Sequence, residues 1–206
     1  LEKMDDNVRL FDHRREDART DWDKGGLANE EWEALLFKSR QLADKAGHYR
    51  FPLPKQFGGK DGTNLGMAII REHLAAKGLG LHNDLQNEAS IVGNFPQVLM
   101  FWHFGTPEQK REFVEGMITG EKRVAFGLTE PNHGSDALFL ETRAERSGGE
   151  WVINGAKRFN TGLHTATHDL IFARTGGKPG SPRGVTCFVV PVDSKGFKVE
   201  FMWWTF

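Results

Sequence analysis

The sequence predicts an α+β protein in which an N-terminal all-α helical domain, residues 1–122, precedes a small antiparallel β-barrel or β-sandwich domain, residues 123–206. In the first part, apolar residues recur at spacings of three, four and seven, which places them on one face of a helix. From Val124 onward, short β-rich runs alternate with glycine-containing turns. The last run has no closing turn, so we expect the β domain to be incomplete at its C-terminal end.

The composition excludes several classes of protein. Hydrophobic residues make up 38% of the 206 residues, and 27 basic and 28 acidic residues leave a net charge of −1. The basic excess of a nucleic-acid-binding protein is therefore missing. No apolar run reaches the roughly 18 residues of a membrane span, and the charged N-terminal stretch is unlike a signal peptide. We expect no nucleic-acid partner, no membrane span and an intracellular protein, cytoplasmic or, in a eukaryote, mitochondrial or peroxisomal.

The first predicted helix begins after Asn29 and ends at Gly47. Asparagine accepts hydrogen bonds from the first backbone N–H groups of a helix, and glycine favours the helix end. The apolar stripe of this helix consists of Trp32, Leu35, Leu36, Leu42, Ala43 and Ala46. The stretch FPLPKQFGGKDG that follows is predicted to be a loop, because prolines and glycines disfavour a helix.

Three further helices are expected. One begins near Thr63 or Asn64 and ends at Gly78, and an apolar segment over residues 85–104 has Pro96 as a kink or boundary. The last begins in the stretch TPEQKREFVEGM, residues 106–117. There a threonine N-cap, a proline at the first helical position and a glutamine three residues after the threonine form the pattern of a capping box.

The β domain is predicted from short runs and their turns. Ser147, Gly148 and Gly149 connect two strands as a hairpin. Three more β-rich runs are DLIFAR (169–174), GVTCFVV (184–190) and FKVEFMWW (197–204). The only cysteine, Cys187, lies in the second of these runs, and we expect it to be a small buried side chain.

The stretch VAFGLTEPNHGSD, residues 124–136, passes from an apolar strand into a polar loop. Pro131 ends the strand, and a turn follows. Gly134 and Ser135 then offer backbone N–H groups and a hydroxyl, which suit an anion or the polar edge of a ring, and Thr129 offers another hydroxyl. From these residues alone, a ligand site and a plain structural turn both remain open.

Several motifs follow one another in a specific order. GLTEPNHGSD (127–136) precedes WVINGAKRFNTG (151–162), and PVDSKGFKV (191–199) comes later. In the first half, PKQFGGKDG (54–62) forms a loop, and FGTPEQKREFVEGMITGEKRVAFGLTEP (104–131) leads into the first motif. In this pattern the chain resembles the acyl-CoA dehydrogenase family, over roughly residues 20–206.

The resemblance implies that the β domain binds FAD. The family positions that contact the flavin correspond here to Phe126, Leu128, Thr129, Gly134 and Ser135 in one segment, and to Phe159, Asn160 and Thr161 in a second. By this resemblance, Thr129 hydrogen-bonds a polar edge of the flavin, Phe159 packs on the ring and Thr161 lies near its reactive nitrogen. Gly134 and Ser135 donate to the pyrophosphate or to the thiol arm of acyl-CoA, so Ser135 is also a substrate-binding candidate.

The second segment departs from the family pattern at two positions. Phe159 stands where the family commonly has tryptophan, which keeps a stacking face but loses an N–H donor. Asn160 replaces an apolar or small residue. The local flavin geometry, and with it the choice of substrate, can therefore differ from the family's.

The implied reaction removes two hydrogens across the Cα–Cβ bond of an acyl-CoA thioester, with FAD as the electron acceptor. The family's base is a glutamate in a C-terminal helical bundle that lies beyond these residues, so no catalytic residue and no metal is assigned. Glu130 is expected to be structural, and residues 87–104 are the candidate wall of the acyl pocket. We expect this chain alone to be inactive and to bind FAD weakly.

The resemblance also implies partners and leaves alternatives. Acyl-CoA is the implied substrate, an electron-transfer flavoprotein or a similar acceptor is the implied partner, and a homodimer or homotetramer is the implied assembly. An acyl-CoA oxidase or a flavin monooxygenase of the same architecture is an alternative. A non-catalytic assembly protein that kept the fold is a second alternative, and an unrelated interaction module is a third.

Overall fold

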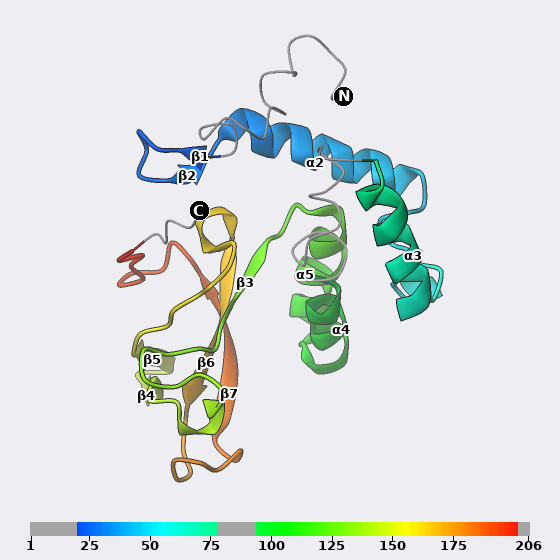
Figure 1. Cartoon of the computed structure of the whole chain (residues 1–206). Helices are drawn as coiled ribbons and strands as arrows, with labels where there is room; N and C mark the ends of the chain where they lie inside the picture. Colours follow the sequence, from blue (N-terminus) through cyan, green and yellow to red (C-terminus); the bar gives the residue numbers. More distant parts are fainter. Residues whose placement is uncertain (1–19, 78–93, 202–206) are drawn as a thin grey trace. The chain divides into compact units, whose positions relative to one another are not determined.

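The computed structural model describes residues 20–77 and 94–201, and they form two compact units (Figure 1). The second unit is Arg123–Lys198, and the described residues before and after it belong to the first unit. The elements of the first unit are β1 (Thr20–Asp21), β2 (Leu27–Ala28), α2 (Glu30–Lys45), η2 (Lys55–Phe57), α3 (Asn64–Ala75), α4 (Asn94–Phe104) and α5 (Pro107–Thr119). The elements of the second unit are β3 (Val124–Gly127), η5 (Ala137–Phe139), β4 (Arg143–Ser147), β5 (Glu150–Asn154), η6 (Leu163–Thr165), β6 (His168–Arg174) and β7 (Val185–Pro191). The predicted order, helices followed by a β-rich part, is confirmed.

Helix α2 begins where the sequence predicts, but its buried face differs from the prediction. The side-chain oxygen of Asn29 accepts hydrogen bonds from the backbone N–H groups of the second and third residues after it. The buried residues Trp32, Leu36 and Arg40 follow one another at intervals of four, whereas the predicted stripe residue Leu42 is 52% exposed. At 3.6 residues per turn, position 42 lies almost opposite position 40 on the helix.

The starts of α3 and α5 are confirmed at their caps. The Thr63 hydroxyl accepts a hydrogen bond at the start of α3, which ends at Ala75. At α5 the capping box is complete: the backbone N–H of Gln109 donates to the Thr106 hydroxyl, and the backbone N–H of Thr106 donates to the Gln109 side chain. Local sequence decides these starts, which is why they could be predicted.

Helix α4 covers only part of the apolar segment predicted over residues 85–104. It begins at Asn94, and residues 78–93 lie outside the described part of the chain. Pro96 lies in the first turn of α4, where its missing N–H has no helical partner to lose. The ring of Phe101 in α4 stacks on that of Phe113 in α5 at 4.6 Å, so these two helices share the core of the unit.

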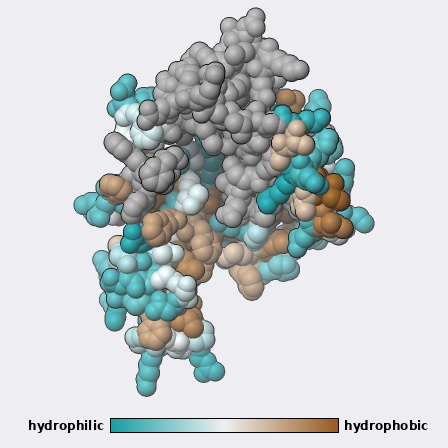
Figure 2. Space-filling model, viewed as in Figure 1, coloured by the Kyte–Doolittle hydropathy of each residue, from teal (hydrophilic) through white to brown (hydrophobic). Residues whose placement is uncertain are grey.

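Exposed apolar side chains of the first unit lie on several elements, among them Phe104 of α4 and two residues of α3. Leu65 and Ile69, one helical turn apart, are both strongly exposed. Figure 2 shows hydrophobic residues gathered on the side where α3 lies in Figure 1. Of the helices described, none is long and apolar enough to cross a membrane, and the longest, α2, has 16 residues.

The sheet of the second unit is mixed, which corrects the antiparallel prediction. Its strand order is β3-β6-β4-β5, and β7 also pairs with β6. The β4–β5 hairpin and the β6–β7 pair are antiparallel, but β3 and β4 each pair with β6 in parallel. A parallel pair needs a long crossover connection, and the strand runs of the sequence do not show which strands such a connection brings together.

Two further predictions for the β domain are wrong. The run over residues 197–204 was expected to be a strand, but Phe197–Phe201 form none, and the rest of the run lies outside the described residues. Cys187 was expected to be buried, but its side chain on β7 is exposed. Strand β7 has one paired edge, and alternate residues of an edge strand reach the open face of the sheet.

Candidate functional site

Strand β3 positions the first residue of the candidate site. Val124 and Ala125 are buried, while Phe126 is 41% exposed. The Phe126 ring lies 5.0 Å from the ring of Phe172 on the neighbouring strand β6. Strand β3 therefore presents an exposed aromatic side chain just before the polar loop begins.

Two segments about thirty residues apart lie side by side at this edge of the sheet. The backbone N–H of Arg158 donates to the Thr129 carbonyl at 2.9 Å, and the Lys157 ammonium donates to the Leu128 carbonyl at 3.1 Å. Residues 126–130 and 157–161, which hold six of the eight predicted cofactor positions, are thus in direct contact. The remaining two, Gly134 and Ser135, lie in the exposed outer part of the loop.

A buried ion pair anchors the two segments. Lys157 donates to Glu130 at 2.7 Å, and both side chains are almost completely buried. Glu130 also accepts the backbone N–H groups of Glu141 at 2.6 Å and Thr142 at 2.9 Å. Burial alone would raise the pKa of Glu130, but these hydrogen bonds outweigh it and lower that pKa to about 2. Burial lowers the pKa of Lys157, although the Glu130 charge acts in the opposite direction.

Phe159 is held in a strained backbone conformation. Its φ of 62° lies in the left-handed region that bulky residues rarely adopt, and its side chain is 57% exposed. The Arg158 guanidinium lies 4.3 Å from the centre of the Phe159 ring, and the backbone N–H of Thr161 donates to the Phe159 carbonyl at 2.9 Å. Strain of this kind is often found at functional sites, where it presents a side chain in a fixed orientation.

Asn160 rests on a buried acid that sequence reasoning missed. Its side-chain amide donates to Asp169 of β6 at 2.6 Å, and Asp169 is fully buried. Among the described residues, the other oxygen of Asp169 and the Asn160 oxygen are both buried without a hydrogen-bond partner. Burial raises the pKa of Asp169, although the Asn160 hydrogen bond opposes that change. The sequence contains one sign of this buried acid, because Asp169 stands at the start of an otherwise apolar strand run.

The contact between Asn160 and Asp169 requires a glycine in β3. A Cβ atom built on Gly127 would lie 2.9 Å from the Asn160 amide nitrogen and 3.0 Å from an Asp169 oxygen. A larger residue would therefore push the second segment away from the sheet. The glycine that ends the first strand thus helps to bring the two segments together.

The outer part of the loop carries its own cluster of polar side chains. His133 lies 3.3 Å from Asp136 and 3.2 Å from Glu141 through its two ring nitrogens. The hydrogen bond to Asp136, followed by that to Glu141, raises the pKa of His133. Within the described chain, the backbone N–H groups and hydroxyl at Gly134 and Ser135 have no hydrogen-bond partner, and a Cβ atom on Gly134 would meet open space.

Comparison with known proteins places both units in one family. The family model for the acyl-CoA dehydrogenase N-terminal domain matches residues 2–121, and that for the middle domain matches residues 125–205. Among curated relatives, a 3-(aryl)acrylate reductase of Clostridium sporogenes is 37% identical over 75% of this chain and 39% of its own length. The CarC subunit of the caffeyl-CoA reductase–Etf complex of Acetobacterium woodii is 34% identical over 74% of this chain and 38% of its own length.

Solved structures agree with these matches. A probable acyl-CoA dehydrogenase from Mycobacterium abscessus superposes with a TM-score of 0.64 at 25% identity, over 98% of this chain and 52% of the other. An FAD complex of PigA superposes with a TM-score of 0.62 at 27% identity, over 79% of this chain and 40% of the other. The chain spans about two fifths of the length of the curated relatives that it matches. By its two family domains and its fold, the chain belongs to the acyl-CoA dehydrogenase family.

Proposed function

We propose that this chain supplies the helical and middle domains of an FAD-dependent acyl-CoA dehydrogenase. The observation that carries the proposal is the hydrogen bond from the Arg158 N–H to the Thr129 carbonyl at 2.9 Å. This contact joins the two segments whose residues are the candidate flavin contacts. Because the chain spans about two fifths of its curated relatives, the reaction of the whole enzyme, its substrate and its partners are all part of the proposal.

The exposed groups of the two segments fit a flavin. Phe126 and Phe159 present aromatic faces that a flat heteroaromatic ring can stack against. The hydroxyls of Thr129 and Thr161 have no hydrogen-bond partner within the described ranges and can form hydrogen bonds with the polar edge of such a ring. The free donors at Gly134 and Ser135 suit the phosphates of the cofactor or the thiol arm of acyl-CoA.

FAD, when bound, supplies the electron acceptor for dehydrogenation of the substrate. The residues of this chain would position it, and they would keep its ring against the edge of the sheet. The two buried carboxylates near the segments do not suit the base that removes the α-proton. Glu130, with a pKa of about 2 and all its hydrogen bonds made, is a very weak base, and the fully buried Asp169 cannot reach a substrate.

The same chemistry in the opposite direction would reduce an activated acrylate, and this reduction is a second candidate function. The relatives from Clostridium sporogenes and Acetobacterium woodii are both named reductases, and the second belongs to an Etf complex. We infer that acyl-CoA or enoyl-CoA is the substrate class and that an electron-transfer flavoprotein is the redox partner. We also propose that the protein is a homo-oligomer and that it is located in the cytoplasm, or in a mitochondrion or peroxisome of a eukaryote.

The test is a titration of the purified protein with FAD, followed by its visible absorption and by quenching of its fluorescence. We expect a spectral change on binding that weakens at least tenfold in Phe159→Ala and in Thr129→Val. Trp151→Ala is the matched control, since Trp151 is an exposed aromatic on the β4–β5 hairpin and is not one of the candidate flavin contacts. Equal FAD affinity in all variants would reject the proposed site, and a complete enzyme that binds no FAD would favour the assembly-protein alternative.

Anaerobic addition of acyl-CoA to the FAD-loaded protein tests the missing base. We expect no bleaching of the flavin by the 206-residue chain alone, because the described residues around the two segments offer no suitable base. Bleaching would contradict that expectation and would place the base within this chain. Oxygen consumption with acyl-CoA by the complete enzyme would instead identify an oxidase.

A further inference from the structure

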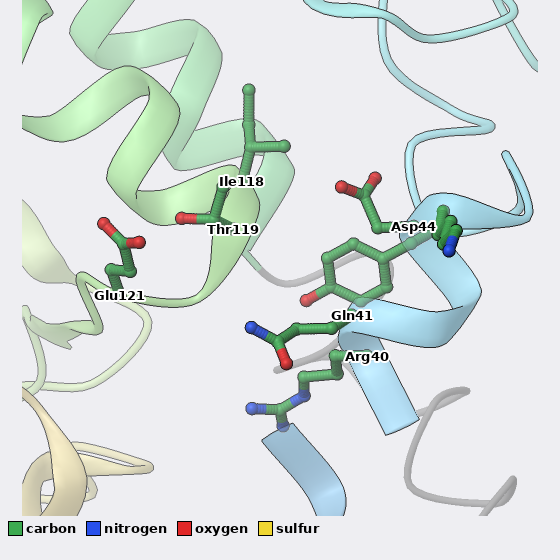
Figure 3. A pocket seen from close by; sticks show the side chains of 8 residues that line it. Arg40, Gln41, Asp44, Ile118, Thr119 and Glu121 are labelled. Carbon is green, nitrogen blue, oxygen red and sulfur yellow. The ribbon is translucent and has the colours of Figure 1, made fainter. Parts of the chain in front are cut away.

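A pocket in the helical unit has no role in the proposed flavin site. It lies between the end of α2 and the end of α5, and its volume is about 240 Å³. The residues that line it are Arg40, Gln41, Asp44, Lys45, Tyr49, Ile118, Thr119 and Glu121. Figure 3 shows Arg40 and Gln41 extending from α2 on one side, with Thr119 and Glu121 across from them.

Arg40 is buried in this pocket without a counter-charge. It is 9% exposed, and its Nε is fully buried with no hydrogen-bond partner. Throughout the described ranges, no carboxylate oxygen lies within 4 Å of its guanidinium, and no group accepts a hydrogen bond from it. A buried, unpaired cation costs several kcal/mol in a folded protein, so a charge in this position calls for a partner.

Two other arginines show how this protein normally satisfies a guanidinium. Arg50 donates to both oxygens of Asp44, at 2.7 and 2.8 Å, and also to Glu115 at 3.1 Å. Arg174 is as buried as Arg40, and within the described residues its Nε also lacks a partner, but its terminal nitrogens donate to backbone carbonyls, among them those of Gly176 and Ser181. In the part of the chain that the structure describes, Arg40 has neither kind of partner.

The acidic residues around the pocket do not serve as the partner. Asp44 lines the pocket, but both of its oxygens are held by Arg50. Glu121 is exposed and makes no ion pair with Arg40. Gln41 is also exposed beside Arg40, and within the described part of the chain its amide has no hydrogen-bond partner. The donors on the α2 side of the pocket therefore remain available to a ligand.

We propose that this pocket binds a small oxyanion, a carboxylate or phosphate group, through the Arg40 guanidinium and the Gln41 amide. The planar guanidinium matches the two oxygens of such a group, and a partly dry environment strengthens the contact. The volume is below the roughly 300–1,000 Å³ of pockets that enclose whole organic ligands, which favours a single anionic group. The site uses residues of the helical unit only and does not depend on the proposed flavin function.

The test measures the thermal unfolding of the protein against inorganic phosphate and against acetate, with sodium chloride at matched ionic strength. A ligand that binds the folded state raises Tm with the logarithm of its concentration. We expect phosphate or acetate to raise Tm by roughly 5–10 °C at a hundred times the Kd, and chloride to have no such effect. Whichever of the two anions acts at lower concentration identifies the preferred group.

Variants assign the effect to Arg40. Arg40→Met is expected to abolish the anion-dependent shift and, in chloride, to unfold at or above the wild-type temperature, because an unpaired buried charge has been removed. Lys38→Met, on an exposed residue of the same helix, is the matched control and keeps the shift. Gln41→Ala, on another exposed residue, is expected to weaken anion binding severalfold and serves if Arg40→Met does not fold.

Three outcomes would overturn the proposal. The first is a wild-type protein whose Tm responds equally to phosphate, acetate and chloride. The second is an anion-dependent shift that survives unchanged in Arg40→Met, or in Gln41→Ala if Arg40→Met does not fold. The third is a clear destabilisation of Arg40→Met in chloride without any anion effect in the wild type, which would mean that a carboxylate of the protein itself already occupies the pocket.

Discussion

Replacing Glu130 by glutamine tests whether the buried ion pair holds the two segments together. The Oε1 atom of Glu130 accepts from the Thr142 N–H and from Lys157, and its Oε2 atom accepts from the Glu141 N–H. A glutamine has only one acceptor oxygen. In its better orientation the amide nitrogen faces the Glu141 N–H, and Lys157 remains charged, buried and without a carboxylate.

The expected loss in the free energy of unfolding follows from that geometry. Removing one member of a buried ion pair typically costs about 3–5 kcal/mol, because the other charge is left uncompensated. For Glu130→Gln we expect a loss in this range at neutral pH. The assay is urea denaturation, read as a lower midpoint at an unchanged slope. Glu145→Gln is the matched control, because Glu145 is an exposed carboxylate in the same unit, and it should change the free energy by less than about 0.5 kcal/mol.

A second substitution and the pH dependence separate charge imbalance from lost packing. Lys157→Met combined with Glu130→Gln should be less destabilised than Glu130→Gln alone, because no unpaired charge remains. The folded-state pKa of Glu130 is lowered from 4.5 to about 2, so its contribution is present above pH 4.5 and is lost as the pH falls through 2. A double variant as unstable as the sum of the single variants, or a loss below about 1 kcal/mol for Glu130→Gln, would refute the reasoning.

Three further substitutions test other parts of the site. Gly127→Ala should displace Asn160 and cost about 1–3 kcal/mol in urea denaturation, with weaker FAD binding, whereas Gly134→Ala should leave stability unchanged, because its Cβ atom meets open space. Phe159→Gly should change the free energy of unfolding by less than about 1 kcal/mol, because relief of a left-handed backbone strain of about 1–2 kcal/mol offsets the lost contacts. The same variant should weaken FAD binding in a flavin titration. An NMR titration should place the pKa of His133 above 6.5. The stabilisation by His133 should be present below pH 6.5 and be lost as the pH rises through the folded-state pKa. This pH dependence of the stability should disappear in His133→Gln.

Features of the fold that depend on neighbouring residues could be predicted from the sequence. The capping box of α5 is an example, since Thr106 and Gln109 contact each other across one helical turn. The turn between β4 and β5 is another, because two glycines follow Ser147 directly. In both cases, residues close together in the sequence determine the local structure.

Features that depend on distant contacts could not be predicted in this way. The parallel pairing of β3 with β6 joins Val124 to His168, and no local pattern encodes it. The same limit applies to Lys157, which the sequence shows only as one basic residue in a turn but which pairs with Glu130 inside the structure. The resemblance indicated which two segments form the candidate site, but only the structure shows the buried pair that joins them.

Among the described residues, two of the departures from the usual rules of folding lie at the candidate sites, one in each unit, while Arg71, Gln97 and Arg174 also hold buried polar atoms without partners. In the second unit, Phe159 has a left-handed backbone, and Asn160 and Asp169 leave buried oxygens without partners. In the first unit, Arg40 is a buried cation that pairs with no carboxylate of the described residues. Each departure costs stability, and such costs are expected where a protein binds a ligand. Because the two places share no residue, the stabilisation by FAD and that by a small oxyanion should add when both are present, and strong non-additivity would mean that one ligand acts at both.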